Sequence, residues 1–323
     1  MRVIGGFALV ESSKKQYLIG ISCTLLGAIF WGFSGASSEY LMEVYHLPAP
    51  WISMVRMLCA GIILFVWLSF KQMDGLKGIW KDKVSWKSLL AFSIVGLMAN
   101  QLTYLMAISH TNAGTATVLQ YIAPVFILAY ICLKSHKKPN RKELIGISLT
   151  LAGIFLITTH GNIQSLVISS LGLSWGILSA ITLAIYNLVP IKIIRKWGSL
   201  VVTCYGMLIG GVVGALLFQQ WRIKVELDLS ALGALFVVVV FGTVIPYTLY
   251  LKGVEQIGAV KASMIASVEP LAATVFTAIL LGTKFTMIDI IGFLLIIATV
   301  ILLAYKEEKK QHEKKKINKT SLT

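Results

Sequence analysis

Long apolar stretches, separated by short polar segments, make up most of the chain. A helix that crosses a lipid bilayer needs about 20 consecutive, mainly apolar residues. Ten runs of the sequence are long enough to span, at 17–38, 51–70, 88–109, 114–133, 143–160, 171–191, 199–219, 231–251, 258–281 and 287–305. The pattern predicts an all-α integral membrane protein with ten transmembrane helices.

The second half of this pattern repeats the first. An advance of 146 positions brings Tyr104 onto Tyr250 and Pro124 onto Pro270, and the match runs without a gap from the third to the fifth helix. The first two helices match more weakly and need an offset nearer 152. The chain is therefore expected to contain two copies of one five-helix unit. Because five is odd, the second copy would enter the membrane from the opposite face, which predicts inverted-topology repeats.

These boundaries divide the chain into five parts. We predict a cytoplasmic N-tail at 1–16, a first repeat at 17–160, an external linker at 161–170, a second repeat at 171–305 and a basic cytoplasmic tail at 306–323.

Composition and charge agree with a membrane protein. Of 323 residues, 57% are hydrophobic and 13% are charged, whereas soluble domains carry about 25% charged residues. The net charge of +15 would also suit a nucleic-acid-binding protein. With the N-terminus in the cytoplasm, however, 25 of the 29 Lys and Arg fall on the cytoplasmic side, as the positive-inside rule requires. The basic surplus therefore indicates topology and no nucleic-acid partner. We expect a multi-pass protein of the cell inner (plasma) membrane with both termini in the cytoplasm.

Motifs of catalysis and metal binding are missing from the sequence. The four cysteines are isolated within predicted helices, and the five histidines lie at helix ends, in loops or in a tail. No CxxC, HExxH or Walker A pattern occurs. Glu143 and Asp289 fall in first turns of predicted helices, where acidic residues complement the helix dipole. We therefore predict no enzyme, no catalytic residue, no metal and no cofactor.

Two charged residues lie inside apolar runs. Glu269 precedes Pro270 near the centre of the ninth run, where a charge costs roughly 3 kcal/mol or more and is expected to face a cavity or a partner. Arg56 lies five residues into the second run. It either snorkels outward or pairs with Glu269 or Glu39. We interpret Glu269 and Arg56 as coupling residues, and a structural ion pair remains the alternative for Glu269.

Polar side chains and two prolines gather near the middle of several runs. Pro124 and Pro270 are candidate hinges because proline removes a helical hydrogen bond. The candidate substrate-binding residues are Gln120, Tyr121, Tyr104, Tyr247, Tyr250, Asn187 and Trp31. Such clusters near broken helices are typical of a transporter site at the membrane midplane, although the same side chains also hold helices together.

Several stretches resemble a known family. They are Ala28 to Gly32, the Arg56 segment, Gln101 to Pro124, and Ser267 to Pro270 with Leu281-Gly282. Together with the five-plus-five pattern they resemble the EamA-type branch of the drug/metabolite transporter superfamily. The resemblance implies a ten-helix carrier of small metabolites, often an exporter linked to a proton or solute gradient. It also implies that Arg56, Pro124, Glu269 and Pro270 occupy motif positions. The usual Leu-Gly-Glu end of the fourth and ninth helices is replaced by Leu133-Lys-Ser135 and Leu281-Gly-Thr283.

The sequence as a whole favours a secondary active transporter that moves an amino acid-like or amphipathic solute by alternating access, in the exporting direction. A small-molecule channel or a transport-inactive membrane sensor remains the alternative. The expected partners are the solute and the lipid bilayer. Gly206, Gly210 and Gly214 recur every four residues, which indicates a close helix contact either within the bundle or between the subunits of a homodimer.

Overall fold

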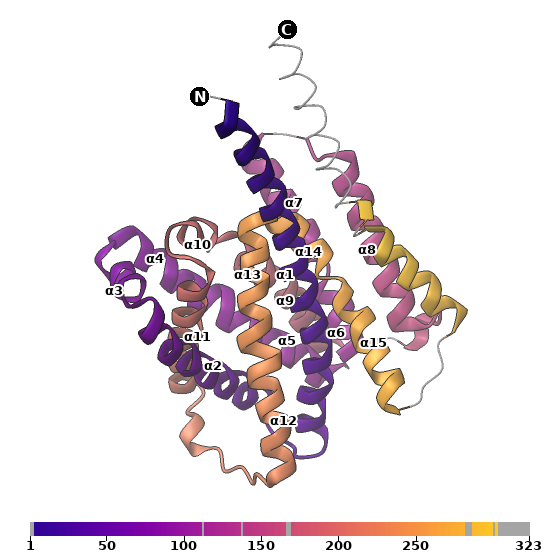
Figure 1. Ribbon diagram of the computed structural model, residues 1–323. Helices are drawn as coiled ribbons and strands as arrows, with labels where there is room; N and C mark the ends of the chain where they lie inside the picture. Colours follow the sequence, from indigo (N-terminus) through magenta and orange to yellow (C-terminus); the bar gives the residue numbers. More distant parts are fainter. Residues whose placement is uncertain are drawn as a thin grey trace.

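The computed structural model describes residues 3–111, 113–136, 138–165, 169–281, 286–299 and 301–302, and all regular secondary structure within them is helical (Figure 1). The first half contains α1 (Val3–Glu43), α2 (Ala49–Lys71), α3 (Met73–Lys81), α4 (Lys83–Ala91), η1 (Phe92–Met98), α5 (Ala99–His110), α6 (Ala113–Gln120), α7 (Ala123–Ser135), α8 (Arg141–Thr159) and the short η2 (Ile163–Ser165). The second half contains α9 (Ser170–Leu188), α10 (Ile191–Trp197), α11 (Ser199–Leu217), the short η3 (Gln220–Arg222), α12 (Leu229–Val239), η4 (Val240–Val244), α13 (Ile245–Ile257), α14 (Ala259–Ile265), α15 (Val268–Leu281) and a helix over Met287–Thr299.

Seven helical stretches of the described residues are long and apolar enough to cross a membrane. They are Lys15–Glu43, Ala49–Lys71, Lys83–His110, Ala116–Ser135, Ser170–Trp197, Ser199–Leu217 and Leu229–Ile257. The three other apolar runs of the sequence lie on α8, on α14 with α15, and on Met287–Thr299. The protein is therefore all-helical with multiple apolar helices.

The helix ends can be compared with the sequence prediction. Helix α1 begins at Val3 instead of at 17, because an apolar run marks contact with the bilayer and not the start of a helix. Glu143 completes a capping box with Asn140 at the start of α8, which confirms its interpretation as a helix-terminal residue. The predicted tail 306–323 and the stretch Gly282-Thr283 lie outside the described residues.

Two helices are interrupted at equivalent places in the two halves. Helix α6 gives way to α7 at Tyr121-Ile122, and α14 gives way to α15 at Ala266-Ser267. A proline follows each break. The helix breaks there because a proline ring clashes with the carbonyl of the residue four positions earlier and its nitrogen has no hydrogen to donate to that carbonyl. For Pro270 that residue is Ala266, whose carbonyl instead accepts the backbone N–H of Glu269 at 2.9 Å. The predicted hinge prolines therefore coincide with real breaks in helical hydrogen bonding.

Two π-helical segments also match under the 146-residue offset. They are η1 and η4, and each continues directly into the next helix, α5 or α13. A Cβ on Gly96 of η1 would lie 3.2 Å from Tyr186 Cα, and one on Gly242 of η4 would lie 1.8 Å from Ser34 Oγ. Gly96 and Gly242 are 146 positions apart, and Ser34 and Tyr186 are 152 apart. Each half therefore presses its π segment against the first helix of the other half in the same way.

The packing between halves is reciprocal throughout. Helix α1 packs along α13, and the equivalent pair α9 and α5 packs in the same manner (Figure 1). The equivalent helices α2 and α11 pack directly on each other. A Cβ on Gly61 would lie 2.8 Å from Leu208, whereas one on Gly214 would lie 1.8 Å from Met54 Sδ. Since the contact moves forward along α11 as it moves backward along α2, these two helices run antiparallel.

The fifth helices of the two halves repeat this arrangement. A Cβ on Gly153 of α8 would lie 2.9 Å from the Gly292 carbonyl, and Thr299 Oγ1 lies 3.5 Å from the carbonyl of Gly146. Gly146 and Gly292, like Gly153 and Thr299, are 146 positions apart. An interface in which each partner presents the same surface to the other is the mark of a two-fold relation, here between the two halves of one chain.

Candidate functional site

A cavity lies where the two halves meet. Its empty space, including the part open to solvent, is about 680 Å³. The lining residues come from both halves: Trp31, Ser34, Gly35, Ser38, Arg56, Asn100, Tyr104, Leu105, Ile108, Gln120, Tyr121, Pro124, Leu183, Gly242, Tyr247, Tyr250, Ser263, Ala266 and Glu269. The wall combines aromatic rings, amides and hydroxyls with one cation and one carboxylate.

Most residues proposed from the sequence face this cavity. Those that line it are Trp31, Arg56, Tyr104, Gln120, Tyr121, Pro124, Tyr247, Tyr250 and Glu269. Asn187 lies one contact away, because its Oδ1 accepts a hydrogen bond from the Tyr250 hydroxyl at 2.7 Å. Pro270 does not line the cavity and follows the break at Ala266-Ser267. Their roles in binding and coupling stay predictions.

Tyr121 joins the two interrupted helices. Its hydroxyl donates to Glu269 Oε2 at 2.9 Å and lies 2.5 Å from the Ala266 carbonyl oxygen. The Ala266 carbonyl is the one that Pro270 leaves without its helical donor. A side chain from the break in one half therefore hydrogen-bonds to the carbonyl at the break of the other half, which also accepts the Glu269 N–H. This contact fixes the Glu269 carboxylate at the cavity wall.

Arg56 has no ionic partner in the described part of the chain. Its side chain is 5% exposed, and its Nε is buried without a hydrogen-bond partner. No ion pair between Arg56 and Glu269 is found among the described residues, and both side chains line the cavity. The sequence showed that both charges were buried, but it could not show that the cavity would separate them. Each charge instead faces the same empty space from opposite halves.

Amide groups form a second polar cluster beside Tyr121. Gln120 Nε2 donates to Ser179 Oγ at 2.7 Å and to Asn100 Oδ1 at 3.2 Å. These contacts connect α6 to α9 and α5. The Tyr104 hydroxyl lies 2.9 Å from Thr117 Oγ1. Satisfied polar groups of this kind hold helices in place as much as they offer binding contacts.

An aromatic cluster closes one side of the cavity. The ring of Trp31 lies 4.9 Å from that of Tyr247 and 5.0 Å from that of Tyr250, measured between centroids. Tyr186 packs behind both tyrosines, at 5.8 Å and 6.0 Å. Trp31 Nε1 is buried with no hydrogen-bond partner among the described residues. The cluster therefore offers π faces and one unused donor.

Several wall residues were not chosen from the sequence as binding residues. Ser34 and Ser38 lie on α1 in a stretch rich in Gly, Ala and Ser. Gly242 and Ser263 carried no signal of their own in the chain. Gly242 could have been found by its 146-residue match to Gly96, since both lie in segments that leave the regular α-helical pattern.

The glycine face of α11 is occupied within the bundle. A Cβ on Gly210 would lie 2.5 Å from Met57 Cε, and one on Gly206 would lie 2.7 Å from Phe92. This placement selects the intramolecular alternative for the four-residue glycine spacing. The described residues contain no group of three or more His, Cys, Asp or Glu side chains that could hold a metal ion.

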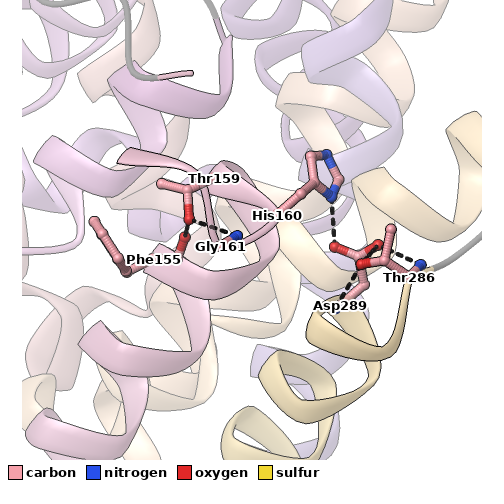
Figure 2. Close-up of polar contacts among 6 residues, drawn as sticks. All are labelled: Phe155, Thr159, His160, Gly161, Thr286 and Asp289. Carbon is pink, nitrogen blue, oxygen red and sulfur yellow. Dashed lines mark hydrogen bonds and ion pairs between the residues drawn. The ribbon is translucent and has the colours of Figure 1, made fainter. Parts of the chain in front are cut away.

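A separate polar contact joins the end of α8 to the helix Met287–Thr299. Figure 2 shows His160 facing Asp289, with Nδ1 and Oδ1 at 2.6 Å. The other oxygen of Asp289 accepts hydrogen bonds from the backbone N–H and the hydroxyl of Thr286, both at 2.8 Å. Asp289 thus caps its own helix and contacts His160, the residue directly after α8. This geometry agrees with the interpretation of Asp289 as a helix-terminal residue.

Two packed repeats of apolar helices around a cavity with a partly polar wall are the architecture of a multi-pass membrane protein. Comparison with known proteins identifies the family. The model of the EamA-like transporter family matches the chain twice, at residues 18–159 and 170–305. The chain belongs to this family, and its two halves are two copies of the family's unit.

Similar proteins agree with this assignment. The chain is 39% identical over 285 residues to the uncharacterized inner membrane transporter YicL of Salmonella typhimurium, covering 88% of this chain and 95% of the relative. It is 25% identical to the uncharacterized transporter YyaM of Bacillus subtilis, covering 88% and 93%. A solved crystal structure shares the fold, with a TM-score of 0.73 at 15% identity, over 91% of this chain and 99% of that one. At the level of the family, the protein is a transporter and not an enzyme.

Proposed function

We propose that the protein is a secondary active transporter that carries a small amino acid-like or amphipathic solute by alternating access. It would have ten transmembrane helices and work as an exporter coupled to a proton or solute gradient. The name of the Salmonella relative supports a place in the inner membrane. The distribution of basic residues supports cytoplasmic termini.

The packing of equivalent helices supports an inverted repeat. Helices α2 and α11 occupy the same place in the two halves, and they run antiparallel, as the Gly61–Leu208 and Gly214–Met54 approaches require. Two equivalent helices that cross a bilayer in opposite directions belong to units of opposite topology. Alternating access follows when such units rock about a site between them.

The observation that carries the proposal is the cavity between the halves. Both proline-broken helices reach it, from opposite repeats, and Tyr121 and Glu269 touch each other there. Discontinuous helices at a midplane site are a recurrent feature of secondary transporters. Within the membrane, a titratable carboxylate at such a site is suited to couple the solute to a proton.

Counterflow in proteoliposomes tests the proposal. A carrier preloaded with unlabelled solute accumulates labelled solute transiently, and its flux saturates with concentration, whereas a channel does neither. We expect Glu269→Gln to retain the fold and lose gradient-driven flux. Glu43→Gln, which removes an exposed carboxylate at the end of α1, should transport as the wild type does. Normal gradient-driven flux in the Glu269→Gln variant over the whole pH range would show that this carboxylate does not couple transport.

A further inference from the structure

We infer that Arg56 forms a carboxylate-binding subsite of the cavity, so that the transported solute is a small carboxylic acid. This inference rests on the proposed function and narrows it to a substrate class. The cavity wall contains buried hydrogen-bonding atoms that have no partner among the described residues.

Three wall residues carry buried polar atoms with no hydrogen-bond partner in the described part of the chain: Arg56 Nε, Trp31 Nε1 and Ser38 Oγ. The guanidinium and the indole can only donate hydrogen bonds, and a serine hydroxyl can also donate. A buried donor without an acceptor costs free energy. A hydrogen-bond acceptor on the solute would therefore satisfy these three atoms.

Charge points to the same group. Arg56 is 5% exposed, and none of the ion pairs among the described residues involves it. Removing a guanidinium from water without a counter-charge is costly. A carboxylate on the solute would supply the counter-charge and two acceptor oxygens. Arginine binds that planar group with two parallel hydrogen bonds, a geometry that lysine does not offer.

The test compares each acid with the same molecule lacking its charge. Purified protein is heated with a panel of small carboxylic acids and amino acids, and in parallel with their primary amides. At saturation we expect at least one acid to raise the melting temperature by a few degrees, while its amide does not. Arg56→Gln should need about 10- to 100-fold more of that acid for the same rise. Arg56→Lys keeps the charge and should fall between the two.

Arg222→Gln is the matched control, because it removes an exposed arginine outside the cavity. The ligand-free melting temperatures of all variants establish that they fold. A panel in which no acid raises the melting temperature, or in which acid and amide act equally, overturns the inference. So does an acid whose effect survives Arg56→Gln unchanged.

Counterflow separates this inference from the proposed function. If an amine or a neutral solute shows counterflow and no acid does, the carrier function stands and the carboxylate subsite falls. If an acid binds through Arg56 and no solute shows counterflow, the subsite stands and the carrier function falls.

A different set of contacts supports a second inference, about how the cavity opens to each face of the membrane. We infer that two matching contacts, one at each end of the bundle, hold the halves closed. Asp82 caps α4, and its Oδ2 accepts a hydrogen bond from Lys196 Nζ of α10 at 2.5 Å. Asp228 caps α12, and its Oδ1 accepts one from the Tyr45 hydroxyl at 2.8 Å.

These contacts are equivalent under the repeat. Asp82 and Asp228 are 146 positions apart. Tyr45 is 152 positions before Trp197, which adjoins Lys196 and donates through Nε1 to Ser85 Oγ at 2.9 Å. In each case a capping aspartate of one half binds the segment that joins the first two helices of the other half. In an inverted repeat the two contacts lie on opposite faces of the membrane, so opening to one face would break one of them.

This second inference is tested by alkylating a cysteine in the cavity. The cysteine is introduced as Ser34→Cys in a background without the native cysteines. The helix caps are kept by changing the donors: Lys196→Gln on one face and Tyr45→Phe on the other. Each should raise the labelling rate from its own face by about 2- to 10-fold and lower it from the opposite face. Lys192→Gln, an exposed residue of α10, is the control. If both variants change labelling from the same face, or neither changes it, the inference is wrong.

Discussion

Replacing Tyr121 with phenylalanine removes a single oxygen atom from the contact between the two broken helices. That oxygen lies 2.9 Å from Glu269 Oε2 and 2.5 Å from the Ala266 carbonyl. The ring is buried and would stay in place. The substitution therefore tests the hydrogen bonds between the halves with little change in packing.

The magnitude follows from the two acceptors. Hydrogen bonds between helices inside membrane proteins contribute about 0.6 kcal/mol on average and up to about 1.7 kcal/mol. Two such bonds, one of them to a carboxylate, together contribute about 1–3 kcal/mol. If they exist in only one state of the transport cycle, their loss shifts the balance between states by about 5- to 150-fold.

Thermal unfolding and transport rates measure the two consequences. We expect the melting temperature of Tyr121→Phe to fall by a few degrees and the rate of gradient-driven flux to change severalfold. Tyr130→Phe is the control, because Tyr130 is exposed on α7 and its hydroxyl contacts Lys134 only within the described residues. If Tyr121→Phe melts and transports as Tyr130→Phe does, the contact does not hold the halves together.

Three further predictions follow from packing, charge and hydrogen bonding. Gly210→Ala should lower stability by about 1–3 kcal/mol through overpacking, since its Cβ would lie 2.8 Å from the Ser93 backbone carbonyl oxygen. Gly233→Ala, with nothing within 4 Å, should be neutral or stabilising in chemical denaturation. Hydrogen bonds from Lys196 and then Ser85 lower the pKa of Asp82, so its contribution to stability is present at neutral pH and is lost in acid. The melting difference between the wild type and Asp82→Asn should therefore shrink as the pH falls below about 4, and a constant difference down to pH 3 would contradict this. Gln120→Leu should cost about 1–3 kcal/mol by leaving buried polar partners unsatisfied, and an unchanged melting temperature would refute it.

Much of the architecture could be predicted because the membrane constrains the chain strongly. Apolar runs of bilayer length mark the helices, and the 146-residue repeat in the sequence relates Pro124 to Pro270. A buried carboxylate beside a proline is costly, so Glu269 could be placed at a cavity. These inferences are possible because the free energies of exposing apolar helices to water and of burying a charge in the membrane are large for a single segment of the sequence.

Contacts between distant segments could not be predicted in the same way. The sequence places Arg56 within an apolar run. Whether it forms an ion pair with Glu269, however, depends on the positions of two helices to within a few ångströms. Asp82 and Asp228 appear as ordinary helix caps until their partners in the other half are known. Gly242 looks like any membrane glycine, and its role depends on the close approach of Ser34.

Labelling of single cysteines from each side of the membrane tests the antiparallel arrangement most directly. Lys77 in α3 and Lys224 after η3 are exposed and lie at nearly equivalent places in the two repeats. With the native cysteines replaced, an impermeant maleimide should label Lys77→Cys from the cytoplasmic face and Lys224→Cys from the external face. Labelling of both residues from one face would contradict the inverted repeat and the alternating-access cavity built on it.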